Sequence, residues 1–389
     1  MSHYPYKEEM EICFVRNKKI TNMTNKQDLL KLQQELPPFG IDPKYIRYIR
    51  RIHRTSGTTA TPLIVALNDT DIDAITAVGA RCFRNAGVVD GMRIVHCLNY
   101  AGWIGGYTDH ASLERAGACV LPWGVGNTEQ LIQMILSLGI EAISCTPSYL
   151  NVLKTVLKEK FGLTPKQLGI KLGLFGGEAG LQNPVFRNKI EEEWGMDAID
   201  ANYGMADVMS IFASENRMTK DGLTFFGNDY LSAQLLVDGQ LVNVKKGLRG
   251  ELVLSTLYKG GLINRTDYRT GDVVEILDDA ENFRFVILGR ADEMLVIRGI
   301  NVYPSTILEI ATRAMNEYGV DFFWQLLVSK ENPITDIVLS IQGIAYDAEL
   351  EKYLHEAVRS ATGISIKIAF DNDAMMSQNM KLKSIVRCL

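Results

Sequence analysis

Hydrophobic and polar residues change their spacing along the chain, and each spacing predicts a different kind of element. Leucines recur with helical spacing in the segment 25–36. From about residue 51, short apolar runs alternate with helical stretches such as NTEQLIQMILSLG and PSYLNVLKTVLKEKFG. The apolar runs are strand candidates: RIVHCL, GACVLP, AISCTP, KLGLFG and DAIDANYG. Alternation of strand and helix predicts a parallel β-sheet covered by helices.

The pattern becomes hairpin-like from about residue 222. AQLLVDGQLVNV places Asp-Gly between two runs of alternating polarity, which is a strong signal for a tight turn. Further strands are predicted in GELVLST, GDVVEIL and FRFVILG. We therefore expect an antiparallel or barrel-like β unit in this portion of the chain.

A domain boundary is expected near Gly289 and Arg290. Beyond it, the spacing predicts helices at 304–317 and 347–361 and strands around 323–329, 336–342 and 364–370. The fold class that results is α/β, with a large N-terminal domain over 1–289 and a small α+β C-terminal domain over 290–389. The large domain would combine parallel sheets covered by helices with the barrel-like unit.

Composition agrees with this prediction and excludes some classes of function. The chain has 389 residues, of which 47% are hydrophobic and 22% charged, as in globular proteins of two or three domains. Its formal net charge of -5 disfavours general binding to nucleic acids or membrane surfaces. The polar N-terminus predicts no signal peptide, and no apolar run reaches the roughly 18 residues of a membrane span. Six scattered cysteines without a CxxC pair are typical of a reduced, cytoplasmic protein.

The segment HRTSGTTATP (53–62) gathers hydroxyl side chains around a glycine. Hydroxyls and unhindered backbone N–H groups donate hydrogen bonds to phosphate oxygens, so this segment is a candidate anion site. No Gly-Lys-Ser/Thr follows, which excludes a Walker sequence. An ordinary polar turn is the alternative. The basic run before it, KYIRYIRRIHR, could bind a nucleic acid, but a solvated face or an approach to the anion site is more typical.

Three further segments place a glycine or a carboxylate at a strand end. In GLFGGEAG (173–180) the glycines would let a planar ring approach the backbone, although a plain strand-to-helix turn also explains them. In DANYGMAD (200–207) an exposed Asp207 could serve Mg²⁺, or it could cap a loop locally. In DYRTGDVVEI (267–276) Asp272 could accept two hydrogen bonds from a ribose diol, or it could be a turn aspartate.

The segment GRADEMLVIRGINVYP (289–304) is the most distinctive. A surface turn and a strand explain its apolar part but not the clustering of Arg290, Asp292 and Arg298. TSGTT, GGE, NYGMAD, YRTGD and this segment, in this order and spacing, resemble the adenylate-forming superfamily. DYRTGD and GRADEMLVIRGINVYPS are most similar to phenylacetate–CoA ligases. The resemblance runs from about residue 20 to the C-terminus.

This resemblance implies an activity in two steps. A carboxylic acid would be activated with Mg·ATP to an acyl-adenylate and pyrophosphate, and the acyl group would then pass to the thiol of CoA with release of AMP. ATP, Mg²⁺ and CoA are therefore the implied cofactors, and relatives suggest a homodimer. Transfer to an amine, or a degenerate homologue that binds nucleotide without activity, are the alternatives.

The resemblance also implies roles for individual residues. Nucleotide contacts would come from Ser56, Gly57, Thr58 and Thr59 at the β- and γ-phosphates, from Gly177, Glu178, Ala179, Asn202 and Tyr203 around the adenine, and from Gly204, Met205 and Ala206 in the same loop. Asp207 would be the Mg²⁺-associated acid. Asp272 would bind the ribose hydroxyls, with Arg290 beside it.

The C-terminal motifs would serve catalysis and domain motion. Asp292 would be the hinge about which a small, mobile domain swings between the half-reactions. Arg298 and Gly299 would face the active site in the second, thiol-accepting state. Lys381 would bridge the carboxylate oxygen and the α-phosphate as charge develops there. The subfamily ending Met-Lys-x-Lys favours Lys381 over Lys383.

The acid would lie beside GWIGGY and CTPSYL. Trp103, Tyr107 and Tyr149 are candidates for lining its pocket, which favours an aromatic acid, and aromatic core residues are the alternative.

Several positions depart from the family pattern. Ala60-Thr61 stands where the phosphate loop usually has Gly-Lys, Ala179 where Pro is frequent, and Asp207 where Glu is usual. SENRMTKDGLTFF lacks the Cys and His that many relatives carry, so we predict no structural zinc.

Overall fold

A computed structural model of the chain describes residues 23–55, 62–177, 181–182, 184–291, 295–297, 300–320, 323–329, 337–371 and 385–388. It divides into two compact units, and each is described here by itself. The first unit comprises 1–182, 187–270 and 275–286, and the second comprises 183–186, 271–274 and 287–389.

One mixed sheet of twelve strands, in the order β11-β10-β12-β13-β14-β9-β8-β7-β6-β5-β3-β4, has most of its residues in the first unit. The strands are β3 (Arg93–His96), β4 (Cys119–Pro122), β5 (Ala142–Cys145), β6 (Leu172–Gly176), β7 (Asp197–Met205), β8 (Met209–Glu215), β9 (Leu223–Phe225), β10 (Leu231–Val237), β11 (Gln240–Asn243), β12 (Arg249–Thr256), β13 (Tyr268–Ile276) and β14 (Arg284–Arg290). The expected α/β class is thereby confirmed, with a large mixed sheet and a small C-terminal one.

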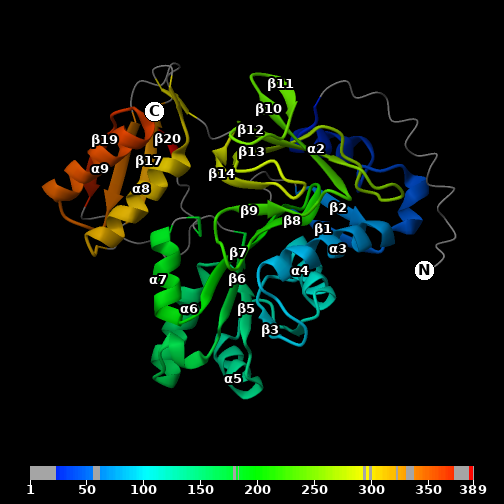
Figure 1. Cartoon of the computed structure of the whole chain (residues 1–389), viewed down its shortest axis with the longest axis horizontal. Helices are drawn as coiled ribbons and strands as arrows, with labels where there is room; N and C mark the ends of the chain where they lie inside the picture. Colours follow the sequence, from blue (N-terminus) through cyan, green and yellow to red (C-terminus); the bar gives the residue numbers. More distant parts are fainter. Residues whose placement is uncertain are drawn as a thin grey trace. The chain divides into compact units, whose positions relative to one another are not determined.

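Strands β3 to β7 form the parallel part of this sheet. All residues of β5 and β6 are buried. Their runs AISC and LGLFG are apolar almost throughout, because a parallel sheet covered on both faces buries the side chains of both faces. The covering helices are α3 (Asp69–Asn85), α4 (Ile104–Arg115), α5 (Thr128–Leu138), α6 (Tyr149–Val156) and α7 (Pro184–Trp194). Helix α3 packs against α4 and β8, and α5 packs against α6. Figure 1 shows α4 on one side of β5–β7 and α6 and α7 on the other.

Strand β7 joins the parallel and antiparallel parts, because it pairs parallel with β6 and antiparallel with β8. The β10–β11 hairpin turns at Asp238 (φ 49°) and Gly239 (φ 78°), the two positive φ angles that an Asp-Gly turn predicts. The strands of the expected barrel-like unit lie in the same hydrogen-bonded sheet as the parallel strands.

A buried aromatic cluster lies between the strands of the antiparallel part. Its ring contacts run from Tyr203 to Phe212 and Phe285, with centroids 5.1 and 5.4 Å apart, and from Phe225 to Phe283 at 4.9 Å. Large rings packed edge to face or stacked bury much apolar area. This cluster fixes β7, β8, β9 and β14 against one another.

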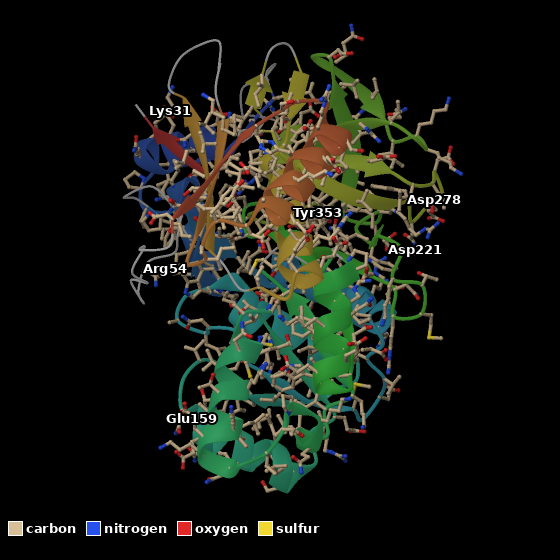
Figure 2. All side chains as sticks on the ribbon, turned by 90° about the vertical axis from the view of Figure 1, so that its left-hand side faces the viewer. Lys31, Arg54, Glu159, Asp221, Asp278 and Tyr353 are labelled. Atoms are coloured by element: carbon tan, nitrogen blue, oxygen red, sulfur yellow. The ribbon has the colours of Figure 1, made fainter. Side chains whose placement is uncertain are left out.

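Charged side chains hold the neighbouring loops. Arg284 donates to Asp278 from Nε at 2.6 Å and also binds Asp221. Figure 2 shows these two carboxylates near each other. Elsewhere in the first unit, the buried Asp71 accepts hydrogen bonds from the backbone of Asn68, Leu262 and Ile263 and from the hydroxyl of Tyr258. Asp71 therefore ties the start of α3 to the loop before β13.

A smaller two-stranded antiparallel sheet pairs β1 (Arg51–Arg54) with β2 (Ile64–Leu67). Before it come α2 (Lys26–Glu35), as the leucine spacing predicts, and a 3₁₀ helix, η2 (Pro43–Tyr48). Asn25 caps α2 by accepting hydrogen bonds from the backbone N–H groups of Gln27 and Asp28.

The second unit carries a four-stranded sheet in the order β19-β18-β17-β20. Its elements are β15 (Leu295–Ile297), β16 (Ile300–Val302), α8 (Pro304–Glu317), β17 (Phe323–Ser329), β18 (Ile337–Gln342), α9 (Ala348–Thr362), β19 (Lys367–Asp371) and β20 (Ile385–Cys388). Both helices expected in this part are confirmed, and they pack against each other. Asp347 caps α9, and Gly363 ends it at φ 76°.

Among the residues that the structure describes, no helix combines the length and the apolar character that crossing a membrane demands.

Candidate functional site

The carboxyl ends of β6 and β7 bring two of the glycine-containing motifs together. The register of this parallel pair shifts after Phe175, so that Gly176 pairs with Asn202. A Cβ on Gly176 would lie 2.5 Å from Cβ of Asn202, and Gly177 has φ 76°, so both positions require glycine. Gly177 and Asn202, both predicted around the adenine, are thus close in space. Crevices outside the carboxyl ends of parallel strands are where such sheets bind ligands.

Asn202 is held by a carboxylate that sequence reasoning missed. Its Nδ2 donates to Oδ2 of Asp109, and Oγ of Ser210 donates to Oδ1 of the same side chain at 3.0 Å. Asp109 is fully buried on α4, and burial raises the pKa of its carboxyl to about 8. The sequence feature that could have identified Asp109 is a single acidic residue on the buried side of a helix, in the segment GYTDHASL.

Asp207 is buried, whereas an exposed carboxylate was expected. The residue is 7% exposed. Its side-chain Oδ2 accepts a hydrogen bond from the hydroxyl of Tyr268 at 2.8 Å, and its backbone carbonyl oxygen accepts one from Nε of Arg265 at 2.7 Å. Within the described part of the chain, Oδ1 accepts no hydrogen bond. Tyr268 therefore fixes one carboxylate oxygen of Asp207.

The other residues of the NYGMAD motif form the end of β7 and the turn after it. Tyr203 is a member of the buried aromatic cluster. A Cβ on Gly204 would lie 1.8 Å from the carbonyl oxygen of Ser210, so the close pairing of β7 and β8 requires glycine here. Met205 pairs with Met209, and Ala206 follows in the turn.

The threonine-rich segment connects β1 and β2. The N–H of Thr55 donates to the carbonyl of Leu63 at 2.9 Å, and the N–H of Leu63 donates to Oγ1 of Thr55 at 3.3 Å. The phosphate-binding candidates Ser56, Gly57, Thr58 and Thr59 lie outside the described residues, as do Glu178 and Ala179.

The basic run before this segment contacts aromatic residues at the start of α4. The guanidinium of Arg51 lies 4.2 Å from the ring centroid of Tyr107, and that of Arg54 lies 5.4 Å from Trp103. Arg54 is exposed (Figure 2). Between these two arginines, burial and the charge of Arg51 lower the pKa of His53 to about 4. The run therefore supports the GWIGGY segment through cation–π contacts.

Tyr149, the third candidate for the acid pocket, has a different environment. It begins α6, is half-buried, and its hydroxyl lies 3.2 Å from Oγ1 of Thr128 on α5. Burial raises the pKa of the Tyr149 hydroxyl above its ordinary value.

Asp272 and Arg290 contact each other within the second unit. Nη1 of Arg290 donates to Oδ1 of Asp272 at 3.0 Å, and the carboxylate side chain is 13% exposed. Gly271 has φ 78°, and a Cβ there would lie 2.3 Å from Nη2 of Arg290. The glycine of the RTGD motif thus makes room for the guanidinium. Asp292, Arg298, Gly299 and Lys381 lie outside the described residues.

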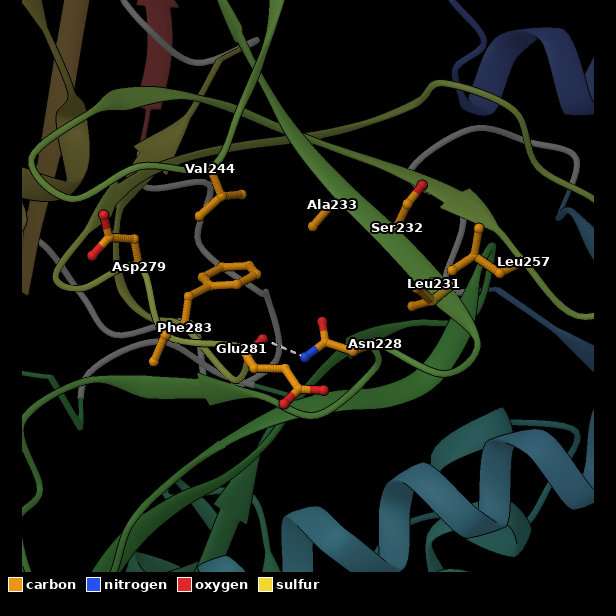
Figure 3. A pocket seen from close by; sticks show the side chains of 10 residues that line it. Asn228, Leu231, Ser232, Ala233, Val244, Leu257, Asp279, Glu281 and Phe283 are labelled. Atoms are coloured by element: carbon orange, nitrogen blue, oxygen red, sulfur yellow. Dashed lines mark hydrogen bonds between the residues drawn. The ribbon is translucent and has the colours of Figure 1, made fainter.

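A cavity of about 320 Å³ lies elsewhere in the first unit (Figure 3). Its lining residues are Asn228, Leu231, Ser232, Ala233, Val244, Leu257, Asp279, Ala280, Glu281 and Phe283. Nδ2 of Asn228 donates to the carbonyl oxygen of Glu281 at its edge. None of these ten residues belongs to a motif predicted to bind nucleotide or acid.

No group of three or more His, Cys, Asp or Glu side chains in the described ranges is arranged to hold a metal ion.

Two curated relatives share substantial sequence with this chain, whereas no protein-family model matches it. Phenylacetate-coenzyme A ligase of Pseudomonas putida is 34% identical over 297 residues, which cover 74% of this chain and 64% of that protein. Phenylacetate-coenzyme A ligase of Escherichia coli (strain K12) is 34% identical over 291 residues, with the same two shares of 74% and 64%. The chain thus spans less than two thirds of the length of these relatives.

The fold has a close counterpart among solved structures. 2-Hydroxyisobutyryl-CoA ligase, in the postadenylation state with 2-HIB-AMP, matches with a TM-score of 0.77 at 22% identity, over 99% of this chain and 86% of that one. Sequence identity to the ligases and this shared fold agree with the order of the five motifs. The chain is therefore a homologue of the phenylacetate-coenzyme A ligases over about three quarters of its length, and it shares the fold of 2-hydroxyisobutyryl-CoA ligase.

Proposed function

We propose that this protein is an AMP-forming acid–CoA ligase. The observation that supports the proposal is the pairing of Gly176 with Asn202 where β6 and β7 end, because both belong to segments expected to bind the nucleotide. The identity of 34% to two phenylacetate-coenzyme A ligases supports the same reaction class.

The first half-reaction would be an in-line displacement at phosphorus. A carboxylate oxygen of the acid attacks the α-phosphorus of ATP, and the bond to pyrophosphate breaks, giving the acyl-adenylate. Mg²⁺ would neutralise phosphate charge, and the second oxygen of Asp207 fits it directly or through water. Asn202 and Gly177 would bind the base, Asp272 would accept hydrogen bonds from the ribose hydroxyls, and positioning supplies much of the acceleration.

The second half-reaction would transfer the acyl group. The thiol of CoA loses its proton and attacks the acyl carbon, and the carbon–oxygen bond to AMP breaks. In this state Arg298 and Gly299 would face the reacting groups, after the unit that carries them has turned about Asp292.

We propose an aromatic acid as the substrate. Trp103, Tyr107 and Tyr149 would contribute to its pocket, since aromatic rings pack favourably on a phenyl group. Both relatives are phenylacetate-coenzyme A ligases, which supports this class of substrate.

Pyrophosphate exchange into ATP tests the first step. The full chain with Mg²⁺ is expected to exchange label in the presence of phenylacetate and more weakly with straight-chain acids of similar size. AMP release with CoA, compared with a panel of amines, then identifies the acceptor. Absence of exchange with every acid would instead support a degenerate nucleotide-binding homologue, which Ala60-Thr61 and Asp207 favour as departures from the family pattern.

Replacing Asp272 by alanine is expected to weaken ATP binding by about 10–100-fold. The reason is the loss of two hydrogen bonds to a charged acceptor, worth about 1.5–3 kcal/mol. Isothermal titration of ATP measures the effect. Asp279→Ala, which removes the same charge from an exposed position at the cavity, is the matched control and should bind ATP as the wild type does. Equal affinity of the Asp272 variant and the wild type would contradict the ribose role.

A further inference from the structure

Asp109 is a carboxylate whose burial needs an explanation. It lies on α4, far from Asn202 and Ser210 in the sequence, and is wholly removed from solvent. Removing a carboxyl group from water is unfavourable unless hydrogen bonds replace the lost hydration. Here the replacement comes from the side-chain amide of Asn202 and the hydroxyl of Ser210.

These contacts orient the amide of Asn202. Its Nδ2 donates to Oδ2 of Asp109, so Oδ1 points away from that carboxyl group. In the described part of the chain, Oδ1 of Asn202 accepts no hydrogen bond, and this side chain is only half-buried. The amide therefore presents its carbonyl oxygen, an acceptor, on the side away from Asp109.

The orientation does not depend on the protonation state of Asp109. Burial raises the pKa of this carboxyl, but the hydroxyl of Ser210 can either donate to Oδ1 or accept a proton from it. Oδ2 consequently remains an acceptor for Asn202 in both states.

We propose that Asp109 is a positioning residue that turns the carbonyl oxygen of Asn202 toward the nucleotide base and so selects adenine over guanine. Adenine carries an amino donor at position 6, where guanine carries a carbonyl acceptor. An amide oxygen facing this position attracts the first base and repels the second. The inference rests on the proposed function, in which Asn202 contacts the base.

Direct binding of ATP and GTP to the full chain, in the presence of Mg²⁺, tests this proposal. The wild type is expected to prefer ATP. Asp109→Leu keeps the branched shape of the side chain but removes the acceptor, so Asn202 can rotate, and the ratio of the two dissociation constants should fall about tenfold. Asp109→Asn should keep the wild-type ratio, because its amide oxygen accepts from Asn202 while its amide nitrogen donates to Ser210.

Two further variants separate positioning from a general structural effect. Ser210→Ala removes the other hydrogen bond to Asp109 and should leave the ratio unchanged. In an Asn202→Ala background, Asp109→Leu should no longer alter the ratio, since the residue acts through Asn202. A wild-type protein without preference for ATP, an unchanged ratio in Asp109→Leu, or an equal loss in the Asn202→Ala background would each overturn the proposal.

Failure of the positioning role and failure of the ligase assignment can be told apart. Pyrophosphate exchange by the wild type decides the proposed function, whereas the ratio of nucleotide affinities decides the role of Asp109. Exchange with an unaltered affinity ratio in Asp109→Leu rejects only the positioning role. If Asp109→Leu abolishes the preference for ATP but the wild type shows no pyrophosphate exchange, the positioning role is kept and the ligase assignment is rejected.

Discussion

Replacing Lys381 by alanine is expected to lower the rate of acyl-adenylate formation by about 10²–10³-fold. The ammonium group would stabilise the negative charge that develops between the acid and the α-phosphate, and it would contribute less to the ground state. Affinity for ATP should therefore remain close to that of the wild type. Pyrophosphate exchange measures the rate, and equilibrium titration of ATP measures the affinity.

Lys383→Ala provides the matched control, because it removes the same charge two residues away. It should retain exchange at nearly the wild-type rate. If Lys383→Ala loses exchange and Lys381→Ala keeps it, the assignment moves to Lys383. Unchanged exchange in both variants would remove the lysine from the mechanism.

The second large effect concerns stability. Arg187→Ala is expected to lower the free energy of unfolding of the first unit by about 3–5 kcal/mol. Nη2 of Arg187 donates to Oε1 of Glu215 at 2.6 Å, and the two side chains are only 10% and 3% exposed. Removing the arginine leaves Glu215 buried without its counter-ion, which is the costly way to break such a pair. Urea denaturation at neutral pH measures the change.

This loss of stability should grow with pH. Burial raises the pKa of Glu215. Burial and the charge of Glu215 also raise the pKa of the neighbouring Asp200, to about 7. The charge of Arg187 opposes both shifts. Without Arg187, both folded-state pKa values rise further above those of the unfolded chain. A raised carboxyl pKa destabilises the folded state increasingly as pH climbs above the unfolded value of about 4, so the variant should approach the wild type under acidic conditions.

Arg249→Ala is the matched control, since it removes an arginine from an ion pair at the surface. Its guanidinium lies 2.8 Å from Glu275 and is 67% exposed. Exposed pairs contribute less than about 1 kcal/mol. Equal destabilisation by the two substitutions, or an Arg187→Ala effect that does not change with pH, would contradict the buried-pair explanation.

Local secondary-structure elements could be predicted from the sequence because they depend on nearby residues. Apolar spacing indicated the strands around β3 to β7 and the helices of the second unit, and Asp-Gly indicated the turn between β10 and β11. Sheet order was not accessible. The strands expected in a barrel-like unit continue the parallel sheet through β7 and β8, and such pairing depends on segments that are not adjacent in the sequence.

The same distinction between local and long-range information applies to the candidate site. Motif order indicated the family and named Asn202, Asp207 and Asp272 as polar groups of a nucleotide site, because each belongs to a short recognisable segment. It could not show that Asp109 holds Asn202, since these residues are 93 positions apart. Nor could it show that Tyr268 buries Asp207, from 61 positions away.

The sequence by itself determined the types of local elements, the order of the motifs and, through that order, the family. The tertiary structure alone decided which side chains meet: the amide of Asn202 with Asp109, the carboxylate of Asp207 with Tyr268, and the guanidinium of Arg290 with Asp272. The physical reason is the sequence separation of the residues that interact. Helix and turn formation follow from neighbours within a few residues, whereas these contacts arise only after distant segments have packed into one fold.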